Sequence, residues 1–219
     1  MIFNQFKSPP PETPYAPFWD FTVGSSFCGD INLNSLVQTI LEKEEEIKSI
    51  PVIKDEYGDF IDGYTGLGED STTVRFGFYN VLSWNTLETN QLKDYILNNL
   101  VIYNEHCGND TPDEVWAQCW VNILSYGERI QPHFHSIGPD TYLSGHFNVQ
   151  TENTSTVYMS PINQLNDPEV IDIKNVNGEM TLFPSYIFHY TTPHHSDISR
   201  ITIAFDLDCK QCTPNWIKL

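Results

Sequence analysis

Two histidines on either side of Phe134, His133 and His135, are the residues whose types and spacing point most directly to chemistry. Alternate residues of a β-strand face the same side of a sheet, so both imidazole rings would project together. Imidazole nitrogens are common ligands of transition metals, and this pair would supply two neighbouring ligands. A His-x-His sequence also arises by chance in core and surface strands, so the pair needs further support.

That support comes from a third histidine and an arginine further along the chain. His189 follows a turn, a strand-like run and a proline, and Arg200 begins the apolar run Arg-Ile-Thr-Ile-Ala-Phe. An arginine on the core face of a strand is costly unless an anion meets it, and guanidinium matches a carboxylate through two parallel hydrogen bonds. Thr202 faces the same way and can add a hydroxyl donor. The alternative for Arg200 is an edge position paired with one of the many acidic residues.

The elements that must position these residues are short strands after Asp113. Turn residues separate most of these strand-like segments, and no helical segment lies between the strands. This pattern is typical of a β-sandwich or jelly roll. We therefore predict a mainly β protein with flanking helices (α+β) and a double-stranded β-helix, or cupin-like jelly-roll, core. The predicted strands are residues 115–124, 131–135, 142–149, 157–159, 170–173, 179–183, 188–191 and 200–206.

The first 110 residues are predicted to support this core. Helical spacing of apolar residues predicts helices over 34–50 and 86–103, and residues 74–82 are strand-like. The proline-rich first 17 residues are expected to form an extended arm on the surface or on a neighbouring subunit, so a homodimer is one expectation. Residues 51–72 are turn-rich. We expect one structural domain overall, with residues 1–110 flanking a catalytic core over 111–219.

The composition bears on which partners the protein binds and in which cellular compartment it lies. With 29 acidic and 11 basic residues the formal net charge is −18, which disfavours binding to nucleic acid. No apolar run is long enough to span a bilayer, and the N-terminus lacks the apolar region of a signal peptide. Five cysteines in such a chain are expected to stay reduced, which predicts a cytoplasmic location.

Four segments carry a resemblance to a known superfamily: GERIQPHFH, YLSGHFNV, GEMTLFPSYIFHY and SRITIAFDL. Together they make residues 115–207 resemble the core of the Fe(II)/2-oxoglutarate-dependent oxygenases. They are most similar to a little-characterised oxygenase family of bacteria and of phages of aquatic bacteria, which for a phage protein would mean the host cytoplasm. The resemblance implies Fe(II) and 2-oxoglutarate as cofactors, with Arg200 and Thr202 gripping the distal carboxylate of 2-oxoglutarate.

One ligand departs from the superfamily pattern. Members usually bind iron with a His-x-Asp/Glu pair and a distal histidine, whereas the resemblance here implies His133, His135 and His189. Three neutral imidazoles suit Fe(II) and leave positions open for a co-substrate. Three alternatives stay open: Asp140 reaches the metal from the following turn, His146 replaces His135, or His135 supports the site without binding metal. Zinc or nickel would also accept three histidines.

Alternation along the predicted strands adds further residues to the expected pocket. Asn122, Tyr142 and Ser144 are expected to contact the co-substrate, and Trp120 and His146 to line the substrate space. No catalytic residue is expected beyond the metal ligands.

The expected function is a 2-oxoglutarate-dependent dioxygenase, an oxidoreductase that hydroxylates an unidentified substrate and converts 2-oxoglutarate and O₂ to succinate and CO₂. One alternative is a three-histidine cupin-type dioxygenase that works without 2-oxoglutarate, in which Arg200 would bind the carboxylate of the substrate. Another is a non-enzymatic jelly-roll binding protein.

Overall fold

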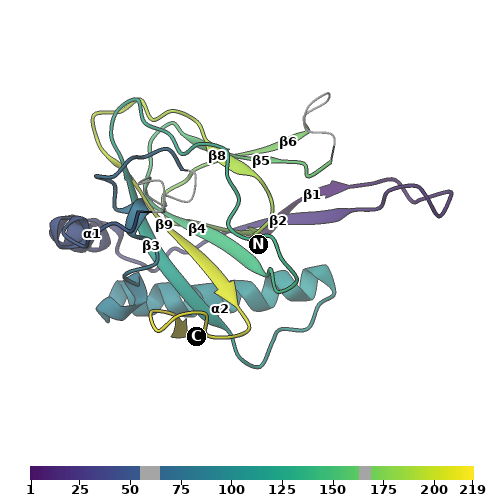
Figure 1. Cartoon of the computed structure of the whole chain (residues 1–219), viewed down its shortest axis with the longest axis horizontal. Helices are drawn as coiled ribbons and strands as arrows, with labels where there is room; N and C mark the ends of the chain where they lie inside the picture. Colours follow the sequence, from purple (N-terminus) through teal and green to yellow (C-terminus); the bar gives the residue numbers. More distant parts are fainter. Residues whose placement is uncertain (55–64, 163–168) are drawn as a thin grey trace.

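A computed structural model of the chain describes residues 1–54, 65–162 and 169–219, which form two antiparallel sheets and flanking helices (Figure 1). The smaller sheet has the order β6 (Val170–Lys174), β5 (Ser155–Met159) and β8 (His189–Thr191). The larger sheet has the order β1 (Ile2–Lys7), β2 (Asp20–Phe27), β7 (Glu179–Pro184), β4 (Leu143–Gln150), β9 (Arg200–Asp208), β3 (Trp116–Leu124) and β10 (Ile217–Lys218). This mainly β architecture confirms the predicted jelly-roll fold class.

Strand β9 separates the hydrophobic core from the candidate site. It lies between β4 and β3, and Thr202 is level with Asn148 on one side and Asn122 on the other. Because side chains alternate along a strand, the odd-numbered residues Ile201 to Leu207 pack in the main core, whereas the even-numbered residues from Arg200 to Asp206 face a cavity. One strand therefore builds both the core and the site.

Two helices cover the core face of the larger sheet. α1 (Leu33–Lys48) begins at Asn32, and α2 (Leu87–Cys107) begins at a capping box formed by Thr86 and ends at Gly108 with φ 71°. A glycine tolerates that left-handed conformation, which is why the helix ends there. Figure 1 shows α2 on the side of the larger sheet opposite the smaller sheet. The helices bury Leu36, Ile40, Leu92, Ile96, Leu100 and Tyr103 against the core.

The predicted strand over residues 74–82 is wrong. This stretch forms two short 3₁₀ helices, Thr73–Arg75 and Val81–Trp84. The guanidinium of Arg75 donates to three backbone carbonyls, and the side chain of Asn80 accepts from the backbone N–H of Leu82. These side-chain bonds hold the backbone in turns, so it does not extend into the strand that its apolar residues suggested.

The predicted strand over residues 131–135 is also wrong as a regular element. It is reduced to one isolated bridge between His133 and His189. Pro132 has no N–H to donate to a neighbouring strand, which prevents a longer ladder at this point.

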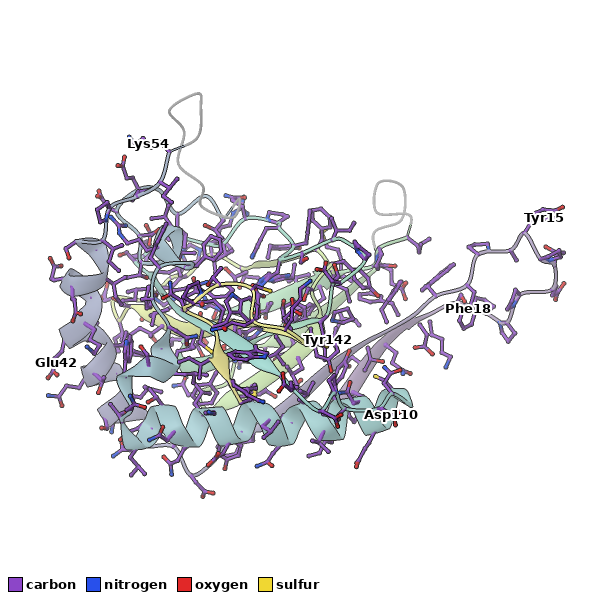
Figure 2. All side chains as sticks on the ribbon, turned by 60° about the horizontal axis from the view of Figure 1, so that its bottom comes forward. Tyr15, Phe18, Glu42, Lys54, Asp110 and Tyr142 are labelled. Atoms are coloured by element: carbon purple, nitrogen blue, oxygen red, sulfur yellow. The ribbon has the colours of Figure 1, made fainter. Side chains whose placement is uncertain are left out.

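The N-terminal arm contains two strands that the sequence did not predict. β1 pairs with β2 along its whole length, and β2 pairs with β7, so the N-terminus is part of the larger sheet. The prolines fall in the connection between them, and Figure 2 shows Tyr15 at the far end of this connection, well outside the body of the protein. Of the turn-rich stretch 51–72, residues 55–64 lie outside the described residues. Within the described ranges, no helix has the length and apolarity required to cross a membrane.

Candidate metal centre

Three histidines converge at the end of the smaller sheet. His189 is the first residue of β8, and His133 and His135 lie in the connection between β3 and β4. The backbone N–H groups of His133 and His135 donate to the carbonyls of His189 (3.1 Å) and Ser185 (2.9 Å), which fixes the connection against the sheet. The ligand nitrogens of the three rings all lie within 4.8 Å of one another. This spacing is suitable for three ligands of a single metal ion.

Each of the three rings uses its Nδ1 atom to contact an oxygen of the protein. The Nδ1 atoms of His133 and His189 lie 2.8 and 3.0 Å from the backbone oxygens of Gln131 and Ile187. The Nδ1 atom of His135 lies 2.5 Å from a carboxylate oxygen of Asp206. An acceptor at Nδ1 keeps the proton on that nitrogen and makes Nε2 the electron-pair donor, which is the usual arrangement of histidine ligands.

Electrostatics favour the neutral form of two rings of the site, those of His189 and His146. Burial, followed by the neighbouring His133 and His135, lowers the pKa of His189 well below its usual value. Burial, followed by the charge of Arg200, lowers the pKa of His146 to about 3. A neutral imidazole retains the lone pair that a metal needs, so this site is prepared for a cation at neutral pH.

Arg200 is a buried cation that lines the same cavity. Its side chain is 1% exposed, and its Nε and Nη1 atoms have no hydrogen-bond partner among the described residues. Burial lowers its pKa to about 10, so it still carries its charge at neutral pH. A buried charge without a partner is costly, and Thr202 lines the cavity beside it. A bound carboxylate would supply the missing partner.

The structure brings most of the predicted pocket residues together. The cavity is lined by the three histidines, Arg200 and Thr202, and also by Trp120, Asn122 and His146. Asn122 is already engaged, since its Oδ1 accepts from the hydroxyl of Thr73 (2.7 Å). His146 lies outside the group of three metal-ligand candidates and bonds through Nε2 to the hydroxyl of Tyr158 (2.9 Å).

Three predicted residues do not reach the cavity. Asp140 is exposed and pairs with Lys210 (2.6 Å), so the structure offers it no route to the metal. The hydroxyl of Tyr142 accepts from Asn104 on α2 (3.0 Å). Ser144 is fully buried, and its hydroxyl bonds to Asp206 instead of facing the cavity. Strand alternation predicted the faces of Tyr142 and Ser144 but not which partners lie opposite them.

Asp206 is a residue of the site that sequence reasoning missed. It lines the cavity and bonds to His135. The signal was present, because Asp206 follows Arg200, Thr202 and Ala204 at alternate positions on one strand face. Phe183 of β7 in the larger sheet, and Thr156 and Thr191 of the smaller sheet, also line the cavity and were not predicted.

Comparisons with known proteins agree with this geometry. Residues 118–206 match the model of a family described as "Putative 2OG-Fe(II) oxygenase". No curated protein matches the chain in sequence.

The similar solved structures share the fold at low sequence identity. A prolyl hydroxylase from Trichoplax adhaerens, in complex with a hypoxia inducible factor peptide, is 12% identical with a TM-score of 0.56, over 86% of this chain and 83% of that one. AviO1 from Streptomyces viridochromogenes is 10% identical with a TM-score of 0.55, over 88% and 91%. A Pseudomonas putida prolyl-4-hydroxylase is 12% identical with a TM-score of 0.50, over 86% and 93%.

The matched segment includes the three histidines, Arg200 and Thr202, which are the residues that the site geometry singled out. This segment matches the 2OG-Fe(II) oxygenase family, which consists of oxidoreductases whose cofactors are Fe(II) and 2-oxoglutarate.

Proposed function

We propose that this oxygenase is a hydroxylase in which His133, His135 and His189 bind Fe(II) while Arg200 and Thr202 bind the distal carboxylate of 2-oxoglutarate. The observation that carries the proposal is Arg200, a fully buried cation with two unpartnered nitrogens in the cavity that the histidines line. A dianionic co-substrate would supply the negatively charged partner for the guanidinium of Arg200. The Nε2 atoms of the three histidines would supply a neutral ligand set that suits Fe(II).

When bound, Fe(II) with 2-oxoglutarate and O₂ supplies the oxidising power: 2-oxoglutarate becomes succinate and CO₂, one oxygen atom enters succinate, and the other becomes the hydroxyl of the product. The chain contributes orientation and exclusion of water. Arg200 and Thr202 hold one end of the co-substrate so that its keto acid end faces the histidines. Phe183 and Trp120 give the cavity apolar walls.

The class of substrate is proposed from the lining of the cavity. Phe76, Trp120 and Phe134 are aromatic and carry no charge. Such a surface favours a neutral or apolar carbon group near the metal over an acidic one, because an anion would lose its hydration without gaining a partner. The prolyl hydroxylases among the structural relatives support hydroxylation as the type of reaction.

The test is succinate formation by protein reconstituted anaerobically with Fe(II). In Arg200→Gln we expect the KM for 2-oxoglutarate to rise at least about 30-fold, because removing one partner of a buried charge pair costs ~2–5 kcal/mol. Arg129→Gln is the matched control, since Arg129 is exposed and does not line the cavity.

Unchanged 2-oxoglutarate turnover in Arg200→Gln would contradict the co-substrate assignment. Substrate-dependent O₂ consumption in the absence of 2-oxoglutarate would instead support the three-histidine dioxygenase that also fits the ligand set.

A further inference from the structure

Of the three candidate metal ligands, His135 has a distinct partner. His133 and His189 each direct Nδ1 at the backbone oxygen two residues earlier in the chain. The corresponding oxygen for His135 is that of His133, and it already accepts from the backbone N–H of His189 (2.9 Å). His135 therefore needs an acceptor from elsewhere in the fold, and Asp206 supplies a carboxylate at 2.5 Å.

Asp206 is itself held in place by a chain of hydroxyl groups. The hydroxyl of Ser144 donates to the same Oδ1 atom that meets His135 (2.6 Å). Ser144 and Ser185 lie 2.8 Å apart at their hydroxyl oxygens. Since Ser144 has one proton and gives it to the carboxylate, Ser185 must donate to Ser144. Ser144 and Asp206 are opposite each other on the paired strands β4 and β9, so the sheet register fixes this arrangement.

We propose that Asp206 is a positioning residue that returns to the site the negative charge that a carboxylate ligand would have provided. This inference rests on the proposed three-histidine metal site. Through Nδ1 of His135 the carboxylate fixes which ring nitrogen carries the proton, aims Nε2 at the metal and makes it a stronger donor. The site thus keeps an anionic group one ring removed from the metal, in place of direct ligation.

The proposed role requires a carboxylate, and not an amide, at position 206. A carboxylate only accepts a hydrogen bond, so Asp206 keeps a proton on Nδ1 of His135. In the Asp206→Asn variant the side-chain amide can donate as well, which would allow Nδ1 to lose its proton and Nε2 to gain it. A ring with its proton on Nε2 cannot bind the metal through that atom.

The test uses Asp206→Asn in the full-length protein, with Asp208→Asn as the matched control. Asp208→Asn makes the same change in charge two residues further along β9, where the carboxylate of Asp208 meets Cys212 at the surface instead of a histidine. Two readouts are taken: the ring ¹⁵N chemical shifts of metal-free protein with labelled histidine, and the affinity for Co(II) by anaerobic absorbance titration. The His135 signals are identified by their loss in His135→Gln.

In the metal-free wild type, we expect the proton of His135 on Nδ1; in Asp206→Asn, we expect a population with the proton on Nε2. Affinity for Co(II) should fall about 10- to 100-fold, the range typical of lost outer partners of a metal ligand. Asp208→Asn should change neither readout.

The inference is overturned if His135 keeps the same protonated nitrogen and the same Co(II) affinity in Asp206→Asn as in Asp208→Asn. A wild-type protein that binds no Co(II) would contradict the proposed metal site, and the ¹⁵N shifts of the metal-free protein would still decide the role of Asp206. Failure of the two proposals is therefore distinguishable.

Discussion

His133 and His189 exchange two backbone hydrogen bonds, with N···O distances of 3.1 and 2.9 Å, although His133 belongs to no strand. This single bridge ties the connection that carries two candidate ligands to the strand that carries the third. The ring of each residue then anchors its Nδ1 atom on a carbonyl two residues earlier. The backbone therefore sets the positions of these two rings before any metal binds.

The first prediction concerns metal binding by the three histidines. His189→Ala should weaken Co(II) binding more than about 100-fold, beyond the ~10–100-fold expected for an outer partner, because one donor to the metal is lost. His195→Ala is the control, since His195 is exposed and lies outside the cluster. Isothermal titration of both variants measures the difference, and equal affinities would remove His189 from the ligand set.

Metal should also stabilise the folded protein. Binding to the native state alone raises stability by about 2.7 kcal/mol at a metal concentration of 100 times Kd. A chelator should lower the Tm of the wild type and leave His189→Ala unaffected. A chelator-induced loss of Tm of equal size in both proteins would place the stabilising metal elsewhere.

Thr202 is predicted to contribute a hydroxyl to co-substrate binding. Thr202→Val keeps the shape of the side chain and removes the donor, so the KM for 2-oxoglutarate should rise about 5- to 10-fold, equivalent to ~1 kcal/mol for one hydrogen bond. Thr13→Val, in the exposed connection between β1 and β2, is the control. Steady-state succinate production measures the KM for 2-oxoglutarate of both variants. A KM that rises in Thr13→Val alone would rule out a local effect of Thr202.

The pKa of His146 predicts a loss of stability in acid. Burial lowers the pKa of this ring to about 3 in the folded protein, against 6.5 ordinarily. Between these values the unfolded chain binds a proton that the folded protein does not. The free energy of unfolding should therefore fall as pH drops below 6.5, with this group contributing up to about 1.4 kcal/mol per pH unit.

His146→Gln should reduce this slope in metal-free protein, whatever its effect on stability at neutral pH. His195→Gln, at an exposed site, should leave the slope unchanged. Urea unfolding between pH 7 and pH 4 gives both slopes, and an unaltered slope in His146→Gln would show that the ring is not the group that resists protonation.

Gly145 is predicted to be required for packing of the larger sheet. A Cβ atom there would lie 2.7 Å or less from two atoms of the Phe205 ring and 2.4 Å from the backbone oxygen of Thr181. Gly145→Ala should therefore cost about 1–3 kcal/mol of stability through overpacking. Gly77→Ala is the control, because a Cβ there meets nothing within 4 Å. Denaturant unfolding that shows equal stability for both variants would contradict this.

The local sequence pattern was sufficient to predict an element where residues close in the chain decide its structure. Thr86 begins α2 as a capping residue, and Gly108 ends it, as such residue types favour. Residues 74–82 were mispredicted because their backbone is held by Arg75 and Asn80, whose partners lie partly in distant segments. Apolar content alone does not reveal such contacts. Strands β1 and β2 were missed because their pairing places them at the edge of a sheet formed largely by the second half of the chain.

The sequence by itself determined the kind of site: two alternate histidines, a third histidine, and an arginine followed by a threonine on one strand face. Period-2 alternation encodes which side chains share a face, and this needs no knowledge of the partner strands. Only the tertiary structure decided which groups meet across that face. The register between β4 and β9 places Ser144 opposite Asp206, and the fold brings Asp206 to His135, 71 positions away in the chain. Such pairings depend on contacts between distant segments, so local residue patterns do not encode them.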